Sequence, residues 1–156
     1  MAIQTVAGLQ TIEGSVEALT ELLAGKIGTA GKVRLYLAAF NPGPASVEAD
    51  FEAHEASFTG YLAVALTWSA VALDDQNRAV AVSLRSFFQA TDGAHPNLIG
   101  GAWIDVTTAA GPPAIDRAVD YYQFPAPVPL NGALDFVAVT ITKRQPDEPG
   151  FAIIES

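Results

Sequence analysis

The chain has 156 residues, of which half are hydrophobic and 16% are charged, so it can form one folded domain and is too apolar for general disorder. Its 17 acidic and 8 basic residues give a net charge of −9, which argues against binding to nucleic acid. The absence of cysteine excludes disulfides and cysteine-ligated metals, and no apolar run reaches the roughly 20 residues of a membrane-spanning helix.

Residues 1–31 are predicted to form an N-terminal anchor or oligomerisation segment, either as a short helix or in extended form. Ser15 is a suitable N-cap for such a helix, and Gly25 is suited to end it. The apolar residues fall at helical spacing and form one stripe, made of Val16, Leu19, Leu22 and Leu23. Because a helix of about ten residues is marginal in water, the stripe is expected to dock on its own domain, on another copy or on a larger partner.

From residue 32 to residue 145 the hydrophobic period changes to two, which predicts a domain of half-buried strands. Six runs follow this period: residues 32–37, 61–68, 80–88, 98–106, 119–124 and 134–142. In the third run, Val80, Val82 and Leu84 form the expected apolar side. The pattern predicts an all-β fold, an antiparallel β-sandwich of jelly-roll or Ig-like type, with a barrel as the alternative.

The connections between the runs carry turn residues. The polar residues 74–78 are typical of a turn that closes a hairpin, and Gly100 and Gly101 indicate a bulge or a close backbone approach. Residues 46–53 are expected to form one or two helical turns that lay Phe51 over the open end of the sandwich. Seven prolines are expected to lie between strands, where they remove no ladder hydrogen bond: Pro42, Pro44, Pro112, Pro113, Pro125, Pro127 and Pro129.

Residues 146–156 are predicted to form an acidic C-terminal tail. This segment contains proline and acidic residues, followed by an apolar stretch at 151–154. The two interpretations are a frayed end and an arm that adds a strand to the sheet of another subunit.

Catalytic and metal-binding residues are scarce. His54 and His95, the two histidines, are interpreted as exposed loop residues, and no Gly-x-Ser-x-Gly motif supports a serine nucleophile. Asp74, Asp75 and Asn77 lack the glycine and distant glutamate of a calcium-binding loop, so we interpret them as a charged turn. The sequence therefore predicts a protein that is not an enzyme and that binds no metal or cofactor.

Aromatic residues offer an alternative site for a sugar. Trp103, Tyr121 and Tyr122 lie near Asp- and Asn-containing loops, which would suit a carbohydrate-binding module. Tyr121 and Tyr122 are adjacent, so they point to opposite faces of a strand, and one of them is expected to be exposed. An exposed tyrosine suits a protein interface as well as a glycan.

Five short stretches carry a resemblance to a protein family: residues 33–36 (Val-Arg-Leu-Tyr), 41–42 (Asn-Pro), 49–53 (Ala-Asp-Phe-Glu-Ala), 56–61 (Ala-Ser-Phe-Thr-Gly-Tyr) and 97–103 (Asn-Leu-Ile-Gly-Gly-Ala-Trp). Over about residues 32–142, the chain resembles small β-rich structural proteins of tailed bacteriophages and prophages. The resemblance implies a role in virion assembly and no catalytic residues.

On this basis we expect a virion protein, most simply a capsid decoration or head-fibre protein that binds the particle surface and self-associates, with a trimer favoured. The alternatives are a tail or fibre accessory protein and a carbohydrate-binding module used in host adhesion. The expected partners are phage capsid or tail proteins, but neither nucleic acid nor membrane. A glycan is the partner expected under the host-adhesion alternative. The expected interface residues are Val16, Leu19, Leu22, Leu23, Phe51 and Tyr121.

Overall fold

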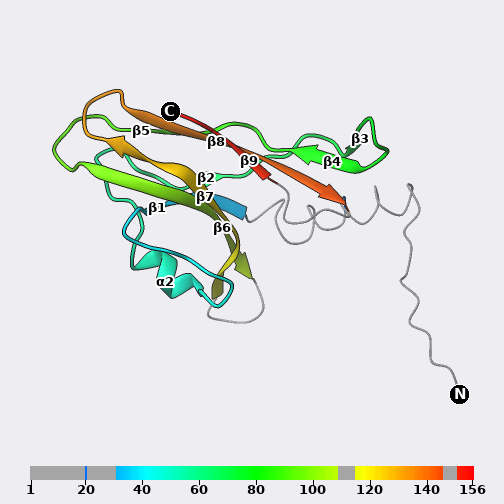
Figure 1. Ribbon diagram of the computed structural model, residues 1–156, viewed down its shortest axis with the longest axis horizontal. Coiled ribbons are helices and arrows are strands. Elements are labelled where there is room, and N and C mark those ends of the chain that lie inside the picture. The colour runs from blue at the N-terminus through cyan, green and yellow to red at the C-terminus, as the bar shows by residue number, and fades with distance from the viewer. Residues whose placement is uncertain (1–19, 21–30, 109–114, 146–150) are drawn as a thin grey trace, which may run out of the picture.

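The computed structural model describes residues 31–108, 115–145 and 151–156, together with Thr20. These residues form two antiparallel sheets with little helix, which confirms the predicted all-β, antiparallel class (Figure 1). The predicted apolar stripe, made of Val16, Leu19, Leu22 and Leu23, lies outside the described residues.

The first sheet has four strands in the order β2 (Val64–Ala65), β1 (Gly31–Leu37), β6 (Asn97–Thr108) and β7 (Ile115–Leu130). The prediction that all seven prolines lie between strands is wrong, because three of them lie inside β7: Pro125, Pro127 and Pro129. β7 is an edge strand of this sheet. Proline is tolerated at an edge because an N–H that faces away from the sheet has no neighbouring strand to bond. The expected irregularity in β6 is confirmed by a register shift between Ile99 and Gly101.

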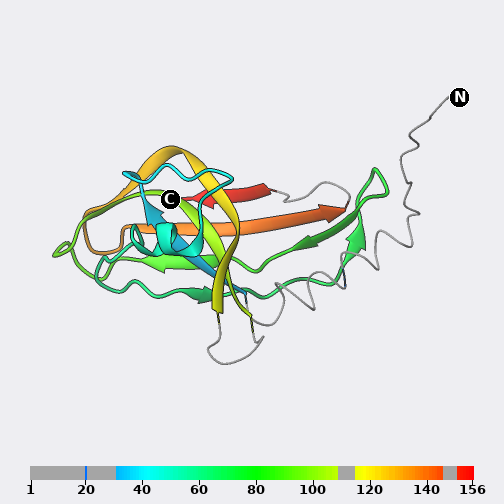
Figure 2. The same ribbon diagram turned by 90° about the horizontal axis from the view of Figure 1, so that it is seen from below.

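The second sheet has five strands. β4 (Ala79–Val82) and β5 (Ser86–Gln89) pair with successive parts of the long β8 (Phe136–Gln145), and β3 (Ala72–Leu73) pairs with β4. β8 runs along most of the molecule, and the β3–β4 hairpin extends to one side of the first sheet (Figure 2). The predicted turn at residues 74–78 closes that hairpin, where the Asp74 carboxylate accepts hydrogen bonds from the backbone N–H groups of Gln76 and Arg78.

Residues 151–155 of the C-terminal segment form a strand and are not a frayed end. β9 (Phe151–Glu155) pairs with β8 of the same chain, from Ala138 opposite Glu155 to Thr142 opposite Phe151. The apolar stretch that was open to two interpretations therefore extends the chain's own sheet.

The main hydrophobic core lies between the two sheets. The first sheet contributes Val33, Leu35 and Ile104, and the second contributes Val137, Val139 and Ile141, among other buried residues. A second layer covers the other side of the first sheet, where the short helix α2 (Glu48–Glu52) and its flanking loops lie (Figure 1). The first sheet is thus covered on both faces.

The predicted inner side of the β4 region is wrong. Ala79 and Ala81 are fully buried, whereas Val82 and Leu84 are exposed. Alternation shows which residues share a face of the strand. Where one face carries alanines and the other carries larger apolar residues, alternation alone does not show which face is buried. The larger apolar side chains consequently lie on the outside of the second sheet.

Candidate interaction surface

Large apolar side chains gather on the outer face of the five-stranded sheet and on the short link between β4 and β5. Their exposed fractions are 37% for Val82, 64% for Leu84, 43% for Phe87 and 54% for Ile153. We call these four residues the apolar sheet face. Phe87 points outward because the adjacent Phe88 is buried in the core, opposite Val137 of β8.

Arg85 organises the aromatic part of this surface. Its guanidinium lies 5.1 Å from the ring centroid of Phe87 and 5.7 Å from that of Phe136, and the two rings are 5.4 Å apart. Arg85 also pairs with Glu155 of β9 at 3.2 Å. An exposed ion pair contributes little stability, but the cation–π contacts hold two aromatic rings and one cation in a fixed arrangement.

The composition of this surface is typical of a protein interface. Exposed apolar patches mark interaction sites, and aromatic residues and arginine are enriched where proteins meet. The charges of Arg85 and Glu155 cancel, so an approaching partner meets a locally neutral area on a chain of net charge −9. This surface is therefore the strongest candidate site in the part of the chain that the structure describes.

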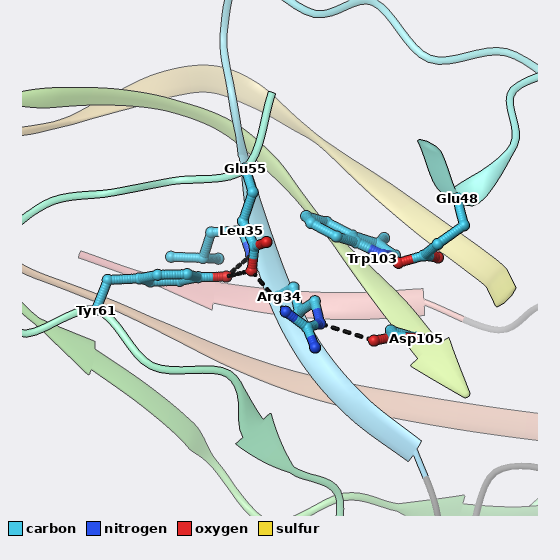
Figure 3. A network of polar contacts seen from close by, with 7 residues as sticks. All are labelled: Arg34, Leu35, Glu48, Glu55, Tyr61, Trp103 and Asp105. Atoms are coloured by element: carbon cyan, nitrogen blue, oxygen red, sulfur yellow. Dashed lines mark hydrogen bonds and ion pairs between the residues drawn. The ribbon is translucent and has the colours of Figure 1, made fainter. Parts of the chain in front are cut away.

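On the four-stranded sheet, a network of hydrogen bonds and ion pairs connects the loop after α2 to the strands (Figure 3). Arg34 Nε donates to Asp105 Oδ2 at 2.7 Å, and Arg34 Nη1 donates to Glu55 Oε1 at 2.9 Å. The Tyr61 hydroxyl donates to the same Glu55 oxygen at 2.8 Å and accepts from the Leu35 backbone N–H at 3.1 Å. The network ties the loop after α2 to β1 and β6.

Burial and the neighbouring charges oppose each other in setting the pKa of Arg34, but burial and the charge of Asp105 act in the same sense on the pKa of Glu48. Burial disfavours the charge on Arg34, but Glu55 and Asp105 outweigh it and raise the pKa of the guanidinium. Burial and the nearby Asp105 raise the pKa of Glu48 to about 7. The Trp103 indole N–H donates to Glu48 Oε1 at 3.3 Å, which links α2 to β6 (Figure 3).

Phe51, an expected interface residue, is not available to a partner. It is 1% exposed, with its ring 5.2 Å from that of Trp103 and 5.8 Å from that of Tyr36. The physical reason is that α2 lies flat on the first sheet and uses Phe51 to cover its outer face. The expected placement of Phe51 over an open end of the sandwich is therefore wrong.

Tyr121, the other expected interface residue in the described part of the chain, is half-buried. Its ring is 6.0 Å from that of Phe51, and it lines a pocket of about 190 Å³ together with residues of the 43–46 loop, Ala118 and Asp120. The remaining expected interface residues, Val16, Leu19, Leu22 and Leu23, lie outside the described residues.

The residues considered for sugar or metal chemistry do not assemble into a site. Trp103 is fully buried beneath α2, which removes the main residue of the carbohydrate-binding alternative. His95 is exposed, and His54 is half-buried with its ring stacked 4.7 Å from that of Phe40. Within the described residues, no three histidine or acidic side chains gather in a way that could hold a metal ion.

Sequence reasoning missed the residues of the apolar sheet face, although one signal could have found part of it. Phe87 and Phe88 are consecutive in a strand, so one of the two rings must leave the core. The apolar stretch 151–154 was a second signal. Because it forms a strand beside β8, its consecutive isoleucines point to opposite faces, and Ile153 lies on the outer one. The contact of Arg85 with Phe136 joins residues far apart in the sequence and had no local signal.

Comparison of the chain with protein-family models, with curated proteins and with solved structures finds no match. Among the described residues, no helix is long and apolar enough to cross a membrane.

Proposed function

We propose that this protein is a structural component of a tailed-phage virion, a capsid decoration or head-fibre protein that attaches to other particle proteins through its apolar sheet face. The proposal rests on the exposure of the apolar sheet face, Val82, Leu84, Phe87 and Ile153. Next to it, Arg85 lies over the rings of Phe87 and Phe136. The resemblance of residues 32–142 to phage structural proteins is the reason to propose a tailed-phage virion as the particle.

The proposal includes the finer description of the fold and the assembly. The two sheets would make a β-sandwich of jelly-roll or Ig-like type, and residues 1–31 would contribute to self-association as a trimer. Binding alone, without a reaction, is sufficient for such a role. A tail or fibre accessory role uses the same surface and differs only in the part of the particle that is bound.

Co-sedimentation tests the proposal directly. Full-length protein is mixed with separately purified heads and tails of the phage or prophage that encodes it, and the bound fraction is measured over a range of concentrations. The test variant is Leu84→Ser with Phe87→Ser, and the matched control is Leu98→Ser, which changes a leucine that is 50% exposed on the other sheet. Circular dichroism and thermal melting establish that each variant is folded.

Binding to heads is expected, with at least about a tenfold loss of affinity in the double variant and none in the control, because central apolar residues carry most interface energy. Binding to tails instead of heads would replace the decoration role with the tail-accessory role. Equal binding by the wild type and the double variant, or binding to neither particle part, would overturn the proposed attachment surface.

A further inference from the structure

A lysine lies almost completely buried between the two sheets. Lys143 of β8 has a side chain that is only 2% exposed, and its ammonium group contacts the Asp120 carboxylate of β7. β8 belongs to the five-stranded sheet and β7 to the four-stranded sheet. The pair therefore connects the two sheets across the interior of the molecule.

The surroundings of this pair are apolar. Lys143 lies directly opposite Ala81 of β4, and it points to the same side of β8 as Ile141, two residues earlier; Ala81 and Ile141 are fully buried. Asp120 lies directly opposite Ile104 of β6, which is also fully buried. A charged amine and a charged carboxylate are both costly to remove from water in such a place.

We propose that Lys143 and Asp120 form an intramolecular isopeptide bond between the two sheets. Transfer of one proton from the ammonium to the carboxylate gives a neutral amine beside a neutral carboxylic acid, which removes both buried charges. The Nζ lone pair attacks Asp120 Cγ, the C–OH bond breaks, and an Nζ proton leaves with the hydroxyl group. The products are one amide and one water molecule, so the step needs no further reactant.

The geometry favours this step in two ways. The two groups are held in contact by strands on opposite sheets, so the reaction is intramolecular and its entropic cost is largely met by folding. The Asp120 side chain is 15% exposed, which gives the released water a path to solvent. The covalent link would hold the sheets together independently of any partner, which goes beyond the proposed attachment function.

Intact mass spectrometry of the denatured full-length protein tests the bond, because denaturation separates an ion pair but not an amide. The wild type is expected to weigh one water molecule less than its sequence, and Lys143→Arg, which keeps the positive charge, is expected to have its full mass. The same variant controls for dehydration elsewhere, since Asp92 precedes Gly93 and can lose water by cyclising. The masses are measured after purification and again after prolonged incubation of the folded protein.

Trypsin locates the bond. Both residues lie on one peptide, because no lysine or arginine lies between Arg117 and Lys143. A linked Lys143 resists cleavage, so the wild type is expected to release residues 118–144 with one water missing, whereas a free Lys143 releases residues 118–143. Thermal melting is expected to show a lower midpoint for Lys143→Arg than for the linked wild type.

A wild type of full mass at both times, with Lys143 cleaved by trypsin, would overturn the bond and leave an ordinary buried ion pair. Loss of water in both the wild type and Lys143→Arg would also overturn it. If the variant does not fold, the wild-type mass and the tryptic peptide still decide the question. These readouts are separate from co-sedimentation, so either proposal can fail without the other.

Discussion

Tyr36 of β1 lies directly opposite Gly101 of β6, and its ring occupies the space that a side chain at position 101 would fill. A Cβ at Gly101 would collide with the Tyr36 hydroxyl and with the backbone oxygen of Tyr122. An aromatic ring laid over a glycine on the neighbouring strand is a recurrent way to fix the register of a sheet. Here it also builds the floor on which Phe51 packs.

Gly101→Ala is expected to lower the free energy of unfolding by about 2 kcal/mol, because a methyl group forced into a packed site displaces its neighbours. Urea unfolding at neutral pH measures the change. Gly43→Ala is the matched control, since no atom lies within 4 Å of the added Cβ. A stability equal to that of the wild type would show that Tyr36 does not occupy this space.

Tyr36→Phe is expected to raise the free energy of unfolding by about 1 kcal/mol. The Tyr36 hydroxyl is buried, and no hydrogen-bond partner for it lies within the described part of the chain, so its removal eliminates an uncompensated desolvation cost. The same burial, together with Tyr121, raises the pKa of Tyr36 to about 12. Chemical denaturation checks the sign, and a clear loss of stability would imply a partner for the hydroxyl.

Glu48 should make stability depend on pH near neutrality. Burial and Asp105 raise the pKa of Glu48 from 4.5 to about 7, so the folded state binds this proton more tightly than the unfolded state does. The contribution is fully present below about pH 4.5 and is lost as the pH rises through about 7. Glu48→Gln should therefore be more stable than the wild type at pH 8 and similar to it at pH 4.5.

Thermal melting across this pH range tests that expectation. Glu52→Gln is the control, because it removes an exposed carboxylate from the same helix. Parallel pH profiles for the wild type and Glu48→Gln would contradict the assignment to Glu48.

Leu134 offers a simple stabilising substitution. It is exposed in the turn before β8 and has a φ of 74°, in the left-handed region that disfavours side chains with a Cβ. Leu134→Gly is expected to gain about 1 kcal/mol of stability, and Leu134→Val to lose stability because its branched Cβ tolerates this region less well. Equal unfolding midpoints for the two variants would refute the role of the backbone conformation.

Much of the fold was predictable because strand alternation is a local property. The periodic runs gave the positions of β1, β6 and β8, and the polar residues 74–78 gave a hairpin. The inner face of β4 was not predictable, because alanines and valines alternate there and only packing decides which side is buried. The extension of β7 through three prolines depends on its position at a sheet edge, which is a property of the assembled sheet.

The candidate surface was less predictable because it depends on which faces other elements cover. Trp103 and Phe51 are apolar residues that sequence reasoning could equally place inside or outside. Both are buried because α2 lies over Trp103 and packs its own Phe51 against that ring. Arg34 and Asp105 are 71 residues apart in the chain, so their pairing has no local signature. Phe87 could be inferred only as one of two alternatives with Phe88.

The prolines of β7 have a consequence for crowded copies of this chain. Pro125, Pro127 and Pro129 are alternate residues, so three of the five residues from 125 to 129 have no N–H with which an incoming strand could bond. The missing N–H groups therefore prevent the β7 edge of one molecule from pairing with the edge strand of the next. Copies of this chain at high local concentration can thus contact one another through side chains without forming fibres by strand pairing along the β7 edge.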